Sequence, residues 1–193
     1  MRICVSIFVT DEASALRAIA SAAEAGADLV ELRIDRIADP ALVGRLVRAC
    51  PTPTLLTCRS RDEGGEADLD DPARLDLLRA AGEGPGLIDV EYETLRRFPS
   101  FFDDSPRPLI ASSHHFAGRP DRLYNLFAEM GRTTAIPKLV WTARTIRDNL
   151  EAFELLRLSK RPAIVFCMGE AGVASRILAR KFGAYLTFAS LDE

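Results

Sequence analysis

Apolar positions along this chain alternate between short runs typical of strands and longer segments with helical spacing. The first run ends near Phe8, and Thr10 or Asp11 can cap the Ala- and Leu-rich helix that follows and stops at Gly26. The same succession continues along the chain and predicts eight strands with seven helical connections. The predicted strands are Ile3–Phe8, Asp28–Ile34, Thr54–Cys58, Leu87–Tyr92, Pro108–Ser113, Ile136–Trp141, Ala163–Cys167 and Ala184–Phe188.

The connections predict a parallel β/α architecture, in which each strand is followed by a helix. Asp39 and Pro40 open one short helix, because proline is favoured at the first helical position. Neither a GxGxxG after the first strand nor a GxxxxGK[ST] loop supports a doubly wound nucleotide-binding sheet. The other connections are expected to hold helices over about Pro72–Ala81, Arg119–Met130, Thr145–Leu158 and Val173–Phe182, and a less regular segment at Thr94–Phe102.

Eight strands favour a (β/α)8 TIM barrel, an α/β fold, formed by a single domain over residues 1–193. A chain of 193 residues is short for this fold, in which ~250 residues are typical. We therefore expect a barrel that lacks its last helix.

Charged residues occupy one face of two predicted strands. With a side-chain period of two, every second residue of the segments Val30–Asp35 and Ile88–Glu93 is apolar. In a parallel barrel the apolar face packs on the helices, so the charged face points into the lumen, where charges must be paired or functional. Solvent exposure in an antiparallel sheet is the alternative. The charged positions are Glu31, Arg33, Asp35, Asp89, Glu91 and Glu93.

Composition restricts the class of partner and the compartment. The formal net charge is −3, so no basic field indicates nucleic-acid binding. The chain has no long apolar stretch and no signal-peptide pattern, which predicts a cytoplasmic protein without membrane contact. The two histidines are adjacent, which makes a zinc site built from several histidines improbable. Scattered cysteines without a CxxC pair predict reduced thiols, at Cys4, Cys50, Cys58 and Cys167.

Lys138 is the most informative single residue, because its ammonium lies within the apolar run Ala135–Trp141. Burial disfavours the charged form of an amine and lowers its pKa, and a neutral lysine can condense with a ketone to form a Schiff base. The alternative is a side chain that extends its amine to water at the strand end.

Three other strand ends carry reactive or charged groups. Arg59–Gly65 holds two arginines, two acids and a glycine pair, Ser112–Phe116 holds both histidines, and Met168–Gly172 precedes Ser175 and Arg176. Active sites of parallel barrels are assembled at the carboxyl ends of the strands. These groups are therefore expected to meet Lys138 at one rim. A glycine-rich phosphate loop after the seventh strand is a weaker reading, because the full motif is missing.

Together these segments resemble type I 3-dehydroquinate dehydratase, the Schiff-base lyase of the shikimate pathway. The resemblance extends from the first strand to the last, and it depends on the order and spacing of the segments. They are Val5-Ser6-Ile7, Glu31–Asp35, Arg59-Ser60 with Glu63-Gly64-Gly65, Asp89-Val90-Glu91, Ser112-Ser113-His114, Pro137-Lys138, and Met168-Gly169 with Gly172 and Ser175-Arg176.

The resemblance implies a lyase that converts the small molecule 3-dehydroquinate into 3-dehydroshikimate and water, with no metal or organic cofactor. Lys138 would form an imine with the C3 ketone, His114 would act as acid and base with a pKa near ~6.5, and Glu63 would orient His114. Arg176 would bind the substrate carboxylate. A homodimer is compatible with the family. The substrate-binding positions that the resemblance implies are Ser6, Glu31, Arg33, Arg59 and Arg176.

The sequence departs from the family pattern at two places. His115 follows His114, so the identity of the base stays open between them, with register favouring His114. The chain stops at Ser190–Glu193, without the Ser-Ala-Pro-Gly-Gln lid loop and final helix of the family. The alternatives are a fragment, part of a longer fusion (shikimate dehydrogenase is a known companion), and a catalytically impaired domain that senses quinate-like ligands. A different Schiff-base lyase or aldolase is a further alternative, which the predicted Glu63–His114 pair disfavours.

Overall fold

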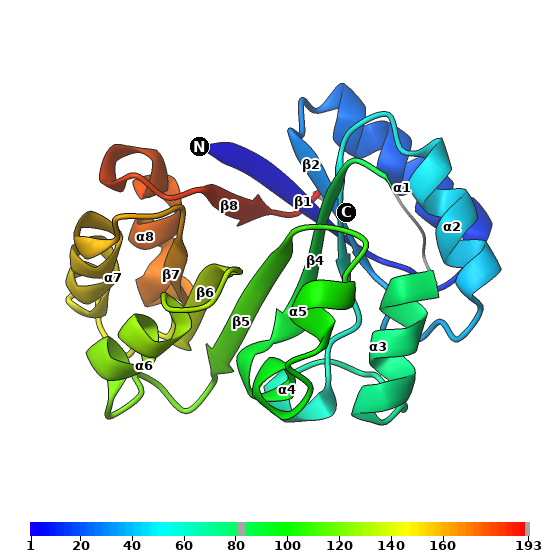
Figure 1. The fold of residues 1–193 in the computed structure, drawn as a ribbon. Helices are drawn as coiled ribbons and strands as arrows, with labels where there is room; N and C mark the ends of the chain where they lie inside the picture. The colour runs from blue at the N-terminus through cyan, green and yellow to red at the C-terminus, as the bar shows by residue number, and fades with distance from the viewer. Residues whose placement is uncertain (81–83, 192–193) are drawn as a thin grey trace.

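Eight parallel strands form one sheet that curves into a nearly closed barrel (Figure 1). The computed structural model describes residues 1–80 and 84–191. Strand order is β7-β6-β5-β4-β3-β2-β1-β8, so every neighbouring pair except β1 and β8 is consecutive in the chain. The predicted barrel is confirmed, with strand bounds that differ from the predicted ones by only one or two residues. The strands are β1 Arg2–Phe8, β2 Leu29–Arg33, β3 Thr54–Thr57, β4 Gly86–Glu91, β5 Leu109–His115, β6 Ile136–Thr142, β7 Ile164–Met168 and β8 Leu186–Ala189.

Helices lie on the outside of the curved sheet (Figure 1). Asp11 caps the first and Asp39 the second, each through its carboxylate and a backbone N–H of the first turn. No helix in the described part of the chain combines the length and apolarity needed to cross a membrane. The α-helices are α1 Glu12–Glu24, α2 Pro40–Ala49, α3 Asp71–Ala80, α4 Tyr92–Arg97, α5 Phe101–Asp104, α6 Leu123–Met130, α7 Asp148–Leu158 and α8 Val173–Ile177, and the 3-10 helices are η1 Arg61–Glu63, η2 Glu170–Gly172 and η3 Ala179–Phe182.

Several predicted helix bounds were wrong, and local hydrogen bonds account for two of them. α6 begins at Leu123 rather than Arg119, because the Arg119 guanidinium binds the carbonyls of Pro120 and Asp121 and keeps this segment in a loop. α7 begins at Asp148 rather than Thr145. The Arg144 backbone N–H donates to the carboxylate of Asp148 at 2.7 Å, and this bond keeps the residues between them in a turn. The predicted end of α3 at Ala81 lies outside the described residues.

Two other connections differ in regularity from the prediction. The segment predicted to be irregular contains α4 and α5, and the single helix predicted after β7 is divided into α8 and η3. Because β4 ends at Glu91 and Tyr92 begins α4, the period-two pattern stops there. The prediction that Glu93 faces the lumen was therefore wrong: Glu93 lies on the exposed side of α4 and pairs with Arg96 at 3.0 Å.

Two apolar layers hold the barrel together. The larger one lies between sheet and helices and contains the outward residues of the strands, such as Val30, Leu32, Ile88 and Val90. The smaller one fills the amino-terminal half of the lumen and includes residues from all eight strands; we call it the lumen floor. Its buried members are Cys4, Leu29, Leu55, Leu87, Ile110, Val140, Ile164, Phe166 and Leu186.

The barrel closes differently at the seam between β7 and β8. Within residues 1–80 and 84–191 no backbone ladder joins these two strands. One hydrogen bond, from the Tyr185 N–H to the Ala163 carbonyl at 2.8 Å, connects the residues that precede them. Further along, the rings of Phe166 and Phe188 meet across the seam with centroids 5.7 Å apart. Side chains therefore complete the wall where the ladder is interrupted.

Candidate active site

A cavity of about 250 Å³ opens at the carboxyl end of the barrel, beyond the lumen floor. It brings together seven of the eight predicted site residues, all except Arg176. The predicted residues that line it are Ser6, Glu31, Arg33, Arg59, Glu63, His114 and Lys138. The other lining residues are Gly64, Phe116, Val140, Phe166, Met168 and Phe188.

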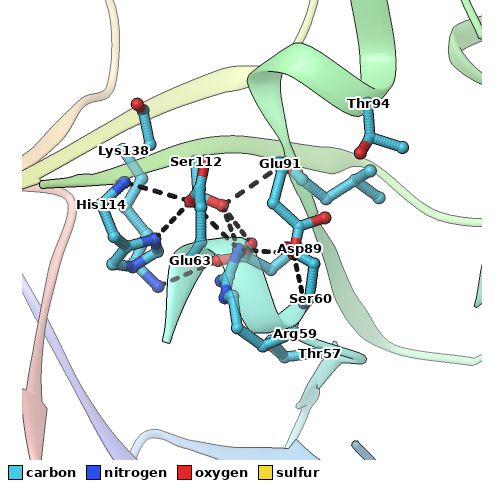
Figure 2. Close-up of polar contacts among 12 residues, drawn as sticks. Thr57, Arg59, Ser60, Glu63, Asp89, Glu91, Thr94, Ser112, His114 and Lys138 are labelled. Carbon is cyan, nitrogen blue, oxygen red and sulfur yellow. Dashed lines mark hydrogen bonds and ion pairs between the residues drawn. The ribbon is translucent and has the colours of Figure 1, made fainter. Parts of the chain in front are cut away.

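Lys138 points into this cavity from β6 and is almost completely buried, with 3% of its surface exposed. Its ammonium does not extend to water. Nζ donates to Asp89 Oδ2 on β4 at 2.9 Å, as Figure 2 shows, and it lies 4.2 Å from the ring centroid of Phe188. A carboxylate and an aromatic face therefore hold the amine from two sides.

Asp89 is the central anion of the site. Ser112 Oγ donates to Asp89 Oδ1 at 2.6 Å, and Arg59 Nη2 donates to the same oxygen at 2.7 Å. Burial opposes ionisation of Asp89, but the charges of Arg59 and Lys138 outweigh it and hold the pKa of this carboxyl well below its usual range. Asp89 consequently remains a carboxylate throughout the neutral and mildly acidic range and does not take protons from its neighbours.

Arg59 connects Asp89 to two further carboxyl groups. Its Nη1 donates to Ser112 Oγ at 2.7 Å and lies 3.3 Å from Glu91 Oε1 and 3.8 Å from Glu63 Oε2. The turn that presents Arg59 is tight, because a Cβ on Gly65 would lie 2.1 Å from the Arg59 carbonyl oxygen. A glycine is therefore required at this position.

Glu63 and His114 form a hydrogen-bonded pair beside Arg59 (Figure 2). Glu63 Oε2 lies 2.8 Å from His114 Nδ1 and also accepts the His114 backbone N–H at 3.0 Å. Because Oε2 already accepts the backbone proton, we assign the Nδ1 proton to His114, so that Nε2 is unprotonated. A neutral imidazole in this tautomer is ready to accept a proton at Nε2.

Both members of this pair are shifted towards their neutral forms. Burial raises the pKa of Glu63 to about 8, with Arg59 lowering it and Glu91 raising it further. Burial, together with the charges of Arg59 and Lys138, brings the pKa of His114 well below its ordinary value of 6.5. The pKa of His114 therefore differs from the predicted value near 6.5, because burial and the nearby cations oppose a positive charge on the imidazole.

The two adjacent histidines have different surroundings, because successive residues of a strand face opposite sides. His114 lines the cavity, whereas His115 is absent from the lining and its Nε2 lies 3.0 Å from Ser113 Oγ. The geometry thus favours His114 over His115 as the group that can contact a ligand.

The side of the cavity formed by β1 and β2 is also polar. Ser6 Oγ donates to Glu31, which accepts from Thr57 Oγ1 at 2.8 Å as well. Arg33 pairs with Asp35 through Nε at 3.2 Å and Nη2 at 2.5 Å. These groups present hydroxyl, carboxylate and guanidinium functions that suit a polyhydroxylated acid.

Arg176 lies on α8, and it is not among the cavity-lining residues. Its Nε atom is buried without a hydrogen-bond partner among the described residues. No group of three or more His, Cys, Asp or Glu side chains in the described ranges is arranged to hold a metal ion.

Sequence reasoning missed the apolar side of the cavity and one buried arginine. Phe166, Met168 and Phe188 line the cavity from β7 and β8. The alternation along β8 could have revealed Phe188, because it lies two residues after Leu186 of the lumen floor. Arg74 contacts Glu91 from α3, and no strand pattern could have identified it, since it lies on a helix.

The comparisons with known proteins agree with one another. Residues 3–193 match the family model described as type I 3-dehydroquinase. The chain is 31% identical over 197 residues to the 3-dehydroquinate dehydratase of Methanothermobacter thermautotrophicus, covering 98% of this chain and 87% of that protein. It is 39% identical over 180 residues to the chloroplastic bifunctional 3-dehydroquinate dehydratase/shikimate dehydrogenase of Arabidopsis thaliana, covering 88% of this chain but 30% of that protein.

The structural comparison leads to the same group of enzymes. The crystal structure of the 3-dehydroquinate dehydratase from Aquifex aeolicus VF5 superposes with a TM-score of 0.86 at 26% identity, covering all of this chain and 90% of that one. The dehydratase from Geobacillus kaustophilus HTA426 gives a TM-score of 0.85 at 25% identity and covers 83% of its chain. From the barrel, its charged cavity and these matches, we conclude that the chain belongs to the type I 3-dehydroquinase family of enzymes.

Proposed function

We propose that this protein dehydrates 3-dehydroquinate to 3-dehydroshikimate through a Schiff base on Lys138. The observation that carries the proposal is the buried Lys138 amine, which lies in a cavity with the Glu63–His114 pair. Membership of the family supports the reaction, and the polar side of the cavity supports a hydroxylated carboxylic acid as substrate.

The first step joins the amine to the substrate. One proton of the Lys138 ammonium passes to His114 Nε2, and the freed amine adds to the C3 ketone. The former ketone oxygen leaves as water, taking one proton from the nitrogen and the proton held by His114, so that a C=N bond replaces C=O. The iminium that forms carries the positive charge formerly on the ammonium. Asp89, which stays ionised, neutralises it in the same position.

The second step eliminates water. The iminium withdraws the electron pair of the C2–H bond while His114 Nε2 takes the proton, which gives an enamine. That electron pair then expels the C1 hydroxyl group, which leaves as water after receiving the proton from His114. Hydrolysis of the imine releases the enone product and restores the Lys138 amine.

The negative charge of the substrate would increase the basicity of His114 during the reaction. Burial and the charges of Arg59 and Lys138 lower the pKa of His114. A bound carboxylate adds a negative charge near these cations and so raises the basicity of His114. Ser6, Glu31, Arg33 and Arg59 would hold the substrate, and Arg176 would contribute only after its side chain turns towards the cavity.

The proposal extends to the pathway and the compartment. Dehydration of 3-dehydroquinate serves the shikimate pathway and hence aromatic amino acid biosynthesis. The four cysteines are all free thiols, which supports a reducing compartment such as the cytoplasm.

A trapping experiment tests the function. The protein is incubated with 3-dehydroquinate, the enone absorbance is followed, and borohydride is added to reduce the imine to a stable amine. We expect product formation and a mass increase on the peptide that contains Lys138, and no adduct in Lys138→Met. Turnover without an adduct in the folded wild type would contradict the Schiff base.

Binding without turnover is the second candidate, favoured by the position of Arg176 outside the cavity lining. In that case calorimetry detects saturable binding of 3-dehydroquinate while the enone absorbance stays flat. The same two measurements therefore separate a dehydratase from a ligand-sensing domain.

A further inference from the structure

A chain of alternating charges runs from Lys138 through the barrel wall to the surface beside α3 and α4. Each link is an ion pair with an N···O distance of 3.3 Å or less. Figure 2 shows its inner part, in which Asp89, Arg59 and Glu91 lie next to one another. In order, its members are Lys138, Asp89, Arg59, Glu91, Arg74, Asp71 and Arg97.

Among the buried cations in this series of ion pairs, Arg74 is the one that does not line the cavity. It lies on α3 with 2% of its surface exposed. Its Nη1 contacts both Glu91 oxygens, at 3.1 and 2.9 Å, and the Cys58 carbonyl at 2.5 Å. Its Nη2 contacts Asp71 at 2.6 Å and Thr94 Oγ1 at 3.3 Å. A buried guanidinium with this many partners is held in one position.

The two acidic partners of Arg74 depend on it to different degrees. Asp71 has a second cation, because Arg97 Nη2 lies 2.7 Å from its other oxygen. Glu91 faces Arg74 from α3, Arg59 from the end of β3, and the Ser60 backbone N–H at 2.9 Å. Without Arg74, Glu91 would depend on Arg59 for its neutralisation.

Arg59 is already shared between two acids. It binds Asp89 at 2.7 Å and Ser112 at 2.7 Å, and its contact with Glu91 is longer, at 3.3 Å. An unneutralised Glu91 would attract Arg59 away from Asp89 and Ser112, since ion pairs are strong in a buried setting. We propose that Arg74 is a positioning residue: it neutralises Glu91 from outside the cavity, so that Arg59 remains bound to Asp89 and Ser112.

The Glu63–His114 pair reports on this arrangement. Glu63 faces Arg59 from the segment after β3, Asp89 and Glu91 from β4, and His114 from β5. Burial raises the pKa of Glu63 to about 8, Arg59 lowers it, and Glu91 raises it. Removing Arg74 leaves the charge of Glu91 less neutralised and raises this pKa further, whereas removing the charge of Glu91 lowers it.

The test measures this titration in the ligand-free protein. The chain has only two histidines, so the ring signals of His114 are identified in NMR spectra by their persistence in His115→Gln. We expect the midpoint near pH 8 to move up by roughly 0.5 to 1 unit in Arg74→Gln and down by a similar amount in Glu91→Gln. The double variant Arg74→Gln/Glu91→Gln should return close to the wild-type midpoint, because both charges are gone.

Matched variants separate positioning from general damage. Arg74→Lys keeps the charge and should titrate like the wild type, as should Arg96→Gln, which breaks an exposed pair with Glu93. If Arg74→Gln does not fold, the comparison of Arg74→Lys, Glu91→Gln and the double variant still decides the matter. A wild-type midpoint in folded Arg74→Gln, a shift of the same sign in Glu91→Gln, or a double variant that departs further than either single variant would overturn the proposal.

The significance of Arg74 for catalysis rests on the proposed function, but the titration does not. If no adduct formed on Lys138, the midpoints predicted for the Arg74 and Glu91 variants would still hold. If those variants titrated like the wild type, an adduct on Lys138 could still form. The two proposals can therefore fail independently.

Discussion

The two walls of the cavity differ in polarity. The wall from β1 to β5 is polar and carries Ser6, Glu31, Arg33, Arg59, Glu63 and His114, whereas the wall from β6 to β8 carries Val140, Phe166, Met168 and Phe188. Lys138 lies where the walls meet, with Asp89 at 2.9 Å on one side and the Phe188 ring at 4.2 Å on the other.

This difference fixes the direction in which the amine points. The apolar wall offers Lys138 an aromatic face but no carboxylate, so its strongest partner lies on the polar side. The polar wall itself is rigid, because its buried charges satisfy one another in a medium of low dielectric constant. In the proposed reaction the polar wall would orient the reacting groups, and the apolar wall would exclude water from the imine.

Replacing Lys138 removes the group that joins the walls and should have the largest effect on activity. We expect Lys138→Met to fold, because methionine fills a similar volume, and to lose more than about 10³-fold in dehydratase activity. Steady-state assays of product absorbance measure this loss. Activity within 10-fold of the wild type would show that no covalent bond to Lys138 is needed.

Removing the central anion of the polar wall should have the largest effect on stability. Asp89→Asn leaves Lys138 and Arg59 without their shared carboxylate and should destabilise the fold by roughly 3–5 kcal/mol. Urea unfolding gives the free energy. Glu93→Gln is the control, since Glu93 is exposed and should change stability by less than about 0.5 kcal/mol. Equal effects of the two variants would refute the central role of Asp89.

The pH dependence of stability tests the neutral state of the polar wall. Burial raises the pKa of Glu63 from 4.5 to about 8, so the stability that its proton confers is fully present below pH 4.5. As the pH rises from 4.5 to about 8, the unfolded chain loses this proton first, and the contribution is lost. The free energy of unfolding of the wild type relative to Glu63→Gln should therefore fall across this range.

Denaturant unfolding at several pH values measures that difference. The same comparison with Glu93→Gln, which alters an exposed carboxylate, should be nearly flat. A wild-type curve that runs parallel to the Glu63→Gln curve between pH 5 and 8 would mean that Glu63 titrates at an ordinary pKa.

Changing the apolar wall should have the smallest effect. Phe188→Leu retains most of the apolar volume but removes the aromatic face beside Lys138 and the contact with Phe166. We expect a loss of about 1–2 kcal/mol in stability and less than about 10-fold in activity. Thermal unfolding and steady-state kinetics measure these effects, and a loss as large as that of Lys138→Met would assign this ring a direct part in the chemistry.

The sequence predicted the polar wall better than the apolar one, for a physical reason. A charge that repeats every second residue on a parallel strand has few explanations, so Glu31 and Asp89 could be assigned to the lumen. An apolar residue can lie in the lumen, the outer core or a seam, so only the shared register with Leu186 on β8 could have assigned Phe188 to the lumen, and it was missed.

The ends of strands and the contacts made by helices could not be predicted from the alternation of residues. Alternation does not indicate where a strand ends, and for that reason Glu93 was assigned to the wrong surface. Arg74 reaches Glu91 from a helix that is distant in sequence, and only the packing of α3 against the barrel determines which carboxylate it meets. Whether Arg176 takes part in substrate binding stays a prediction, since its side chain does not line the cavity.

The pairing of β1 with β8 has a consequence for folding. All other ladders join strands that follow one another along the chain, so they can form during synthesis in the order in which the strands emerge. The ladder from Arg2 to Val5 instead requires Leu186 to Ala189 and closes the long loop that runs from β1 to β8. Its closure entropy makes it a late event, and Phe188 takes its place beside Lys138 only then. The charged groups of β2 to β5 can thus be in place before the surroundings of Lys138 are complete.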